Sequence, residues 1–152
     1  MQDGIQRRVA LDLLSVPPLV FRMVRRRVVS TTLAETNLDI KLLHFEIMRV
    51  LKDEGTLHPA KIGEKLLVAK AQMTHLIDKL VELDFVKRET GSDDRRTINI
   101  TLADKGRKVL EEQDNTVINA MQENMSSLTD RELEDLSDSL RKLRDILVKL
   151  EQ

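Results

Sequence analysis

Polar and cationic side chains gather in two short stretches in the middle of this chain. Residues 70–79 carry, between apolar positions, side chains that can form hydrogen bonds or ion pairs: Lys70, Gln72, Thr74, His75, Asp78 and Lys79. Residues 88–96 add the guanidinium groups of Arg88, Arg95 and Arg96. Gln can bind adenine through two hydrogen bonds, Lys can reach guanine or phosphate, and arginine suits a narrow, electronegative minor groove. Both stretches are therefore candidates for contacts with duplex DNA.

Each stretch also has a simpler interpretation. A helix with polar residues on its outer side is normal in any soluble protein, and arginines beside Asp93 and Asp94 would suit a solvated turn. The residue types alone do not separate these alternatives. The order of the structural elements around them carries more weight.

Other chemistries find little support in the sequence. The chain has no cysteine, which excludes disulfides, thiol catalysis, thiol redox sensing and cysteine-ligated zinc or iron–sulfur centres. His44, His58 and His75 fall on three separate predicted helices, so we expect no zinc site. No nucleophile with its base, phosphate-binding loop or nucleotide fingerprint is present. We therefore expect neither an enzyme nor a bound cofactor.

Composition and charge describe a folded chain with an uneven charge distribution. The 152 residues are 41% hydrophobic and 34% charged. The only aromatic residues are three Phe, so few side chains could stack on the bases of single-stranded nucleic acid. Residues 1–52 carry nine Lys/Arg against five acids, residues 53–105 nine against ten, and residues 106–152 seven against eleven. The net charge of −1 can therefore hide a local basic surface. No apolar run is long enough to span a bilayer and no signal-peptide pattern opens the chain, so we expect a cytoplasmic protein.

Helices are predicted over most of the first 84 residues. Pro17-Pro18 predicts the first turn of a helix running to about residue 32, with a separate short helix over residues 5–14. Asp39 is placed as the N-cap of the next helix, which ends near Gly55. His58-Pro59 opens a shorter helix. Lys70 begins another, whose apolar positions at helical spacing predict one buried face: Met73, Leu76, Ile77, Leu80, Val81 and Leu83.

The pattern changes to that of a β-hairpin after Asp84. Residues 85–90 and 97–102 read as strands, the second with Ile98, Ile100 and Leu102 pointing inward, and a charged tip lies between them. Helix, short helix, turn, helix and hairpin in this order form the winged helix-turn-helix arrangement. The predicted fold is therefore mainly α-helical with a small β-hairpin wing.

A leucine repeat marks the end of the chain. A helix is predicted over residues 104–125, and Thr129 with Glu132 forms a capping box for the last helix. Its leucines are spaced three and four residues apart, as in a coiled-coil seam: Leu133, Leu136, Leu140, Leu143, Leu147 and Leu150. Such a seam usually packs on a partner helix, and packing on the preceding helix of the same chain is the alternative.

The hairpin region resembles a known family. Residues 85–106 look like the wing signature of MarR-type transcriptional regulators: a hydrophobic-Val-x-Arg strand, then Asp-x-Arg, then an alternating strand that ends in Leu-Thr-x-x-Gly. Residues 62–66 and 73–83 are similar to the family's helix-turn-helix, and the resemblance extends over nearly the whole chain from about Pro17. Four positions depart from the pattern: Gly63, Ala69, Asp84 and Ala103.

The resemblance implies a homodimer that binds a pseudo-palindromic operator. It implies dimerisation helices over residues 1–37 and 104–152 that flank a DNA-binding lobe over residues 38–103. The implied DNA-binding residues are Lys70, Ala71, Gln72, Thr74, His75, Lys79, Arg88, Asp94, Arg95 and Arg96, with Arg96 in the minor groove and Asp94 holding its guanidinium group. The implied dimerisation residues are Leu19, Val20, Met23, Leu133, Leu136, Leu140, Leu143, Leu147 and Leu150.

The family also suggests regulation by a small molecule. Many members bind aromatic or phenolic acids between the dimer helices and the lobe, where Met23, Phe45 and Met48 could line a cleft here and Arg22 or Arg26 could bind an anion. Core packing is the alternative for these side chains. The resulting hypothesis is an effector-modulated, dimeric DNA-binding regulator, by family habit a repressor. A dimeric winged-helix scaffold for protein interactions, without specific DNA binding, is the alternative.

Overall fold

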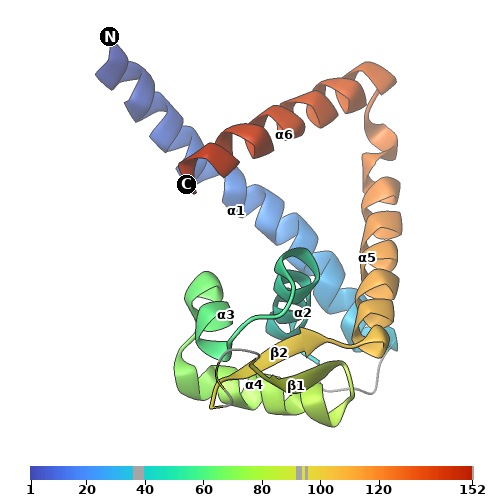
Figure 1. The fold of residues 1–152 in the computed structure, drawn as a ribbon. Helices are drawn as coiled ribbons and strands as arrows, with labels where there is room; N and C mark the ends of the chain where they lie inside the picture. The colour runs from blue at the N-terminus through green and yellow to red at the C-terminus, as the bar shows by residue number, and fades with distance from the viewer. Residues whose placement is uncertain (36–39, 92–93, 95, 152) are drawn as a thin grey trace. The chain divides into compact units, whose positions relative to one another are not determined.

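The computed structural model describes residues 1–35, 40–91, 94 and 96–151, and the side chains of these residues outside 27–35. The described residues form helices and one hairpin, which confirms the predicted fold class (Figure 1). The elements are α1 (Gln2–Glu35), α2 (Leu42–Glu54), α3 (Pro59–Leu66), α4 (Lys70–Glu82), β1 (Val86–Thr90), β2 (Ile98–Leu102), α5 (Asp104–Asn124), a 3₁₀ turn η1 (Met125–Ser127) and α6 (Asp130–Leu150). Residues 1–117 and 118–152 form two compact units.

The first helix differs from the prediction. Instead of a short helix and a second one starting at Pro17, α1 is continuous, with Pro17 and Pro18 inside it. Proline disrupts a helix because its ring nitrogen cannot donate to the carbonyl four residues earlier and because its ring crowds that carbonyl. Here those carbonyls belong to Leu13 and Leu14, whose side chains are exposed. Water can therefore bind the freed carbonyl oxygens, and the helix continues.

The second helix begins later than predicted. Lys41, not Asp39, is its N-cap residue, and Lys41 donates its backbone N–H to Nδ1 of His44 at 2.9 Å. The His44 imidazole, in the first turn of the helix, therefore accepts the backbone N–H of the N-cap residue. Asp39 itself lies outside the described residues. The helix ends as predicted at Gly55, whose φ of 83° is open to glycine without strain.

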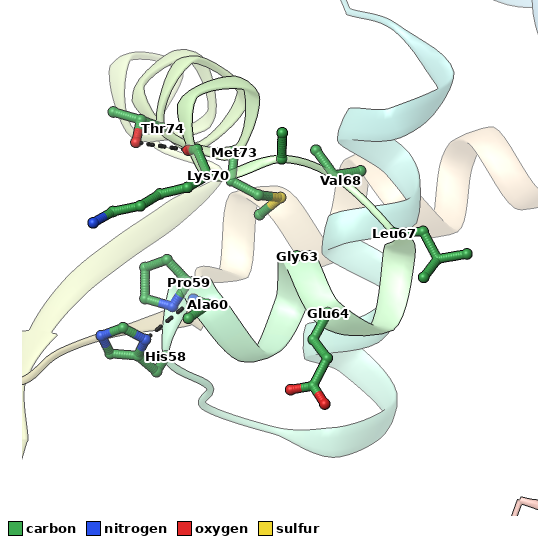
Figure 2. A pocket seen from close by; sticks show the side chains of 11 residues that line it. His58, Pro59, Ala60, Gly63, Glu64, Leu67, Val68, Lys70, Met73 and Thr74 are labelled. Atoms are coloured by element: carbon green, nitrogen blue, oxygen red, sulfur yellow. Dashed lines mark hydrogen bonds between the residues drawn. The ribbon is translucent and has the colours of Figure 1, made fainter.

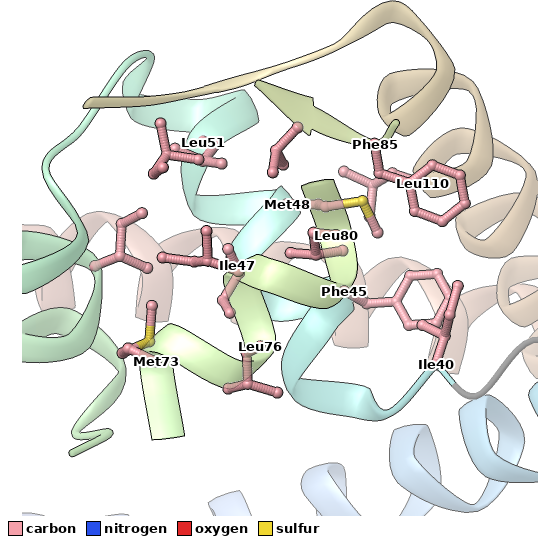
Figure 3. Close-up of a cluster of buried hydrophobic side chains, with 14 residues drawn as sticks. Ile40, Phe45, Ile47, Met48, Leu51, Met73, Leu76, Leu80, Phe85 and Leu110 are labelled. Carbon is pink, nitrogen blue, oxygen red and sulfur yellow. The ribbon is translucent and has the colours of Figure 1, made fainter. Parts of the chain in front are cut away.

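The lobe is built around one hydrophobic core (Figure 3). Apolar side chains from α2, α3, α4, the hairpin and α5 meet there: Ile40, Phe45, Ile47, Met48, Leu51, Ile62, Met73, Leu76, Ile77, Leu80, Phe85, Val86, Ile100 and Leu110. The predicted buried face of α4 is therefore confirmed for Met73, Leu76, Ile77 and Leu80. Phe45 and Met48, weighed above as cleft residues, are 5% and 0% exposed and belong to this core.

The hairpin leaves the core as a two-stranded antiparallel ribbon. Its register pairs Val86 with Leu102 and Arg88 with Ile100. Leu57 and Ile100 exchange backbone hydrogen bonds of 3.1 and 2.8 Å, which fasten the ribbon to the connection between α2 and α3. Ile98 was expected to point inward, but it is 47% exposed. It lies toward the tip, where the core no longer reaches the ribbon.

The junction between α4, the hairpin and α5 is held by backbone contacts. Asp84 adopts φ 63° at the end of α4, a conformation that Asp tolerates better than most residues. Phe85 then donates its N–H to the carbonyl of Leu80 at 2.9 Å, and its own carbonyl accepts from the N–H of Ala103 at 3.0 Å. Gly106 packs directly against that same carbonyl. The start of α5 is therefore tied to the base of the hairpin.

The second unit contains the leucine repeat. Thr129 and Glu132 form the predicted capping box at the start of α6. The leucines that follow are exposed by 37–72% in the chain by itself: Leu136, Leu140, Leu143, Leu147 and Leu150. The repeat therefore lies open to a partner helix. Within the described part of the chain, no helix is long and apolar enough to cross a membrane.

Candidate nucleic-acid interface

The outer side of α4 collects most of the predicted contact residues. Because its other side packs into the core, the polar positions and one small residue point outward. Lys70, Ala71, Gln72, Thr74 and His75 are exposed, and Lys79 is half-buried. The fold thus places on one helix surface the donors and acceptors that can reach base edges and phosphates.

The start of α4 has a modest local anchor. Ala69 occupies the N-cap position and offers no side-chain acceptor to the first turn, as its departure from the family pattern predicts. Thr74 donates its hydroxyl to the carbonyl of Lys70 at 3.1 Å. This bond holds the Thr74 side chain against its own helix, with the hydroxyl oxygen at the surface.

The hairpin tip is shaped by Asp94. Its carboxylate accepts the backbone N–H of Arg96 at 2.9 Å, and its carbonyl accepts the N–H of Thr97 at 3.0 Å. Gly91 closes the tip by donating to the carbonyl of Thr97 at 2.7 Å. The resemblance implies a contact between Asp94 and the Arg96 guanidinium group, whereas this contact is with the Arg96 backbone. Arg96 is exposed, and Arg95 lies outside the described residues.

Two of the predicted cations have acidic neighbours. Arg88 on β1 forms an ion pair with Asp78 on α4, and both side chains are about half exposed. Lys79 lies 3.8 Å from Glu82 within α4. The positive field at this surface is therefore weaker than the number of cations suggests, since each pair cancels part of it.

A groove of about 820 Å³ lies beside the turn between α3 and α4 (Figure 2). At its edge, His58 caps α3 by accepting the N–H of Ala60 on its Nδ1 at 3.1 Å. A Cβ on Gly63 would lie 2.9 Å from the carbonyl oxygen of Val68 and 3.0 Å from Cγ of Met73. The α3–α4 turn and Met73 on α4 therefore leave little room for a Cβ at this position.

The described residues form no metal-binding group. Among them, no group of three or more His, Asp or Glu side chains could hold a metal ion. The histidines are separated: His44 serves the start of α2 and His58 the start of α3, while His75 points outward from α4.

The comparison with protein families identifies the fold. Residues 40–98, which hold α2, the helix-turn-helix and most of the hairpin, match the model described as the MarR family. This part of the chain belongs to the MarR family. MarR proteins are transcriptional regulators and not enzymes, which confirms the prediction of a non-enzymatic protein.

Individual relatives agree with this assignment. The HTH-type transcriptional regulator YfiV of Bacillus subtilis is 31% identical over 72 residues, or 47% of this chain and 45% of that protein. The match thus spans about half the length of that relative. A MarR family protein from Bacillus stearothermophilus has a solved structure with a TM-score of 0.75 and 21% identity, covering 93% of this chain and 97% of that one.

A structural neighbour with a described ligand response is the Bordetella bronchiseptica regulator BpsR. Its TM-score is 0.58 at 21% identity, and the similarity covers 85% of this chain and 98% of BpsR. The structure of BpsR is described as showing how 6-hydroxynicotinic acid regulates its DNA binding. At this identity, both solved structures show that the MarR fold is shared.

Sequence reasoning missed one feature of this MarR-family lobe. It placed Asp78 and Arg88 in separate stretches, one on the helix and one on the hairpin, whereas the fold joins them in an ion pair. Strand alternation contained a usable indication, because Arg88 lies two residues after the buried Val86 and so shares its face of the strand.

Proposed function

We propose that this chain is a homodimeric, sequence-specific regulator of transcription that binds double-stranded DNA. The observation that carries this proposal is the exposed side of α4 on the same lobe as a hairpin tip whose turn Asp94 shapes. Helix α4 would enter the major groove, which at about 12 Å is wide enough for a helix. Its contacts would come from Lys70, Ala71, Gln72, Thr74, His75 and Lys79, and those of the wing from Arg88, Asp94, Arg95 and Arg96.

The homodimer is supported by exposed apolar side chains on α1 and α6. Leu19, Val20 and Met23 are 60%, 43% and 38% exposed, and five leucines of α6, from Leu136 to Leu150, are exposed as well. A monomer would leave these side chains in water, whereas a second copy would bury them at about 25 cal/mol per Å². A two-fold dimer also matches a palindromic operator. By family habit we propose a repressor, acting in the cytoplasm on the chromosome.

The DNA-binding proposal is tested in two steps. Genomic fragments retained by the purified protein at physiological salt should share a palindrome, which then serves as the probe for fluorescence anisotropy. Arg96→Ala should weaken binding by about ten-fold or more, and Lys70→Ala should lower the slope of log K against log salt by about one. Arg131→Ala removes one positive charge from α6, outside the lobe, and is the matched control.

An opposite result favours the scaffold hypothesis. If no site is enriched, or if Arg96→Ala and Lys70→Ala bind the enriched site as the unmodified dimer does, then the surface does not read DNA. The dimer itself should be checked in each variant by sedimentation, because a lost dimer would weaken operator binding without any change in the contacts.

We further propose that a small aromatic or anionic molecule modulates DNA binding. The support is family habit together with BpsR, whose DNA binding responds to 6-hydroxynicotinic acid. A panel of monocyclic aromatic acids, including 6-hydroxynicotinic acid, should contain a compound that releases the operator and raises the thermal midpoint of the free protein. A panel without effect on either measurement would count against this class of effector.

A further inference from the structure

The pairing of Asp78 with Arg88 joins the two DNA-facing elements of the lobe. Asp78 lies on the outer side of α4, one turn beyond Thr74. Arg88 follows Val86 by two residues on β1, so the two side chains leave the same face of the strand. Val86 is buried in the core, while Arg88 reaches past the edge of the core and donates from Nη2 to the Asp78 carboxylate.

The pair of Arg88 and Asp78 contributes little to the stability of the fold. The Arg88 and Asp78 side chains are 42% and 55% exposed, and exposed ion pairs contribute little to the free energy of unfolding. Asp78 alone would place a negative charge on the helix proposed to face phosphates. The pair cancels that charge and links helix to hairpin at a point beyond the last buried contact of β1.

The geometry makes the hairpin sensitive to such a link. From Val86 to Thr90 the strand advances four residues, or about 13 Å at 3.3 Å per residue. A rotation of about 10° at the base would therefore shift the tip by about 2 Å, against a minor groove about 6 Å wide. Residues 87–90 are exposed. The backbone bonds between Leu57 and Ile100 hold β2, and the pair of Arg88 with Asp78 holds β1 to α4.

We propose that Arg88 is a positioning residue. Through Asp78 it holds the hairpin at the angle at which Arg96 and α4 reach one DNA site together, and it does not serve as a phosphate contact. This inference rests on the proposed function and refines the place of Arg88 in it. It assigns a function to Asp78 as well, since the acid on the DNA-facing helix becomes the anchor of the wing.

The two roles of Arg88 predict opposite signs for Asp78→Ala. If Arg88 contacts phosphate, removing Asp78 releases the guanidinium group and deletes a negative charge, so operator binding strengthens. If Arg88 positions the hairpin, Asp78→Ala weakens binding by about three- to ten-fold, because the hairpin contacts then contribute less to the affinity for DNA. Glu82→Ala is the matched control, because it removes an exposed acid that also pairs with a cation, Lys79 of the same helix, and it leaves the hairpin untouched.

Further variants separate a positioning effect from a general one. Arg88→Ala should weaken binding as Asp78→Ala does, leave the salt slope unchanged, and be no more harmful when combined with Asp78→Ala. The exchanged pair Asp78→Arg with Arg88→Asp should recover part of the lost affinity. Urea midpoints should stay within error of the unmodified protein, which shows that each variant folds.

Three results would overturn the inference: Asp78→Ala binding at least as tightly as Glu82→Ala, a salt slope that falls with Arg88→Ala, or a double variant in which both losses add. Hydrogen exchange of the hairpin amides in the free protein keeps the test independent of the proposed function. Faster exchange in Asp78→Ala supports the link even if no operator is found, and unchanged exchange contradicts it.

Discussion

Gly106 offers the sharpest test of how the lobe is joined to α5. A Cβ at this position would overlap the carbonyl oxygen of Phe85 and would lie 2.9 Å from its carbonyl carbon and 3.0 Å from Cδ1 of Leu102. The carbonyl cannot simply move away, because it accepts the N–H of Ala103. Gly106→Ala should therefore push α5 off the hairpin base.

The expected loss in the free energy of unfolding is the sum of two destabilising contributions and one stabilising contribution. Overpacking costs about 1–3 kcal/mol, and weakening a buried backbone hydrogen bond costs about 1–3 kcal/mol. Alanine returns about 1 kcal/mol through its higher helix propensity. The net is a destabilisation of about 3 kcal/mol. With a urea m-value of about 2 kcal/mol per M, the midpoint should fall by roughly 1.5 M.

The assay is urea unfolding followed by circular dichroism at one fixed protein concentration, because self-association changes the apparent stability. Gly4→Ala is the matched control. Gly4 is also helical, but a Cβ there meets nothing within 4 Å, so stability should stay the same or rise slightly. A Gly106→Ala protein as stable as the unmodified one would refute the close approach of α5 to the Phe85 carbonyl.

Three further predictions address the turn, the α2–α5 contact and the leucine repeat. Leu67→Gly should raise the free energy of unfolding by about 1 kcal/mol in urea titrations, because Leu67 is 93% exposed and adopts φ 54°, a conformation that disfavours residues with a Cβ. A lower midpoint would show that its side chain has a structural partner. Arg49 donates to both carboxylate oxygens of Asp114 at 3.0 and 2.6 Å, and this bond raises the pKa of Arg49. A raised arginine pKa changes the free energy of unfolding only when the pH rises to that pKa, which lies above the range tested. Arg49→Ala should therefore destabilise the protein by at most about 1 kcal/mol, the usual limit for a partly exposed pair, and this loss should be the same at about pH 7 and about pH 9. A clear pH dependence between these values would contradict this account. Leu143→Glu should shift sedimentation of the chain toward the monomer while Ser137→Glu, on the same helix outside the repeat, should not, and two identical profiles would argue against α6 as the dimer contact.

Features that depend on neighbouring residues were predictable from the sequence. The spacing of Met73, Leu76, Ile77 and Leu80 identified the buried side of α4, and therefore its exposed side, because helical periodicity is a property of the chain alone. The glycine at position 55 and the capping box at Thr129 ended and started helices where they were expected. These features need only local backbone geometry and one or two side chains.

Features that depend on the tertiary surroundings of a residue could not be predicted from the sequence. Pro17 predicts a helix start, yet whether a proline ends a helix depends on whether the carbonyls it leaves free find another partner, here the solvent around an exposed turn. Strand alternation indicated the face on which Ile98 lies. It could not indicate how far the core extends along the hairpin, and Ile98 lies beyond that limit.

The sequence by itself determined the order of the elements, the outward side of α4, the charged hairpin tip and the leucine repeat, since composition and periodicity act over a few residues. The tertiary structure decided which of these meet. Only folding brought Asp78 on the helix to Arg88 on the hairpin and Gly106 against the Phe85 carbonyl. The physical reason is that both contacts depend on how α4, the hairpin and α5 pack around a shared core, which fixes distances that no local pattern encodes.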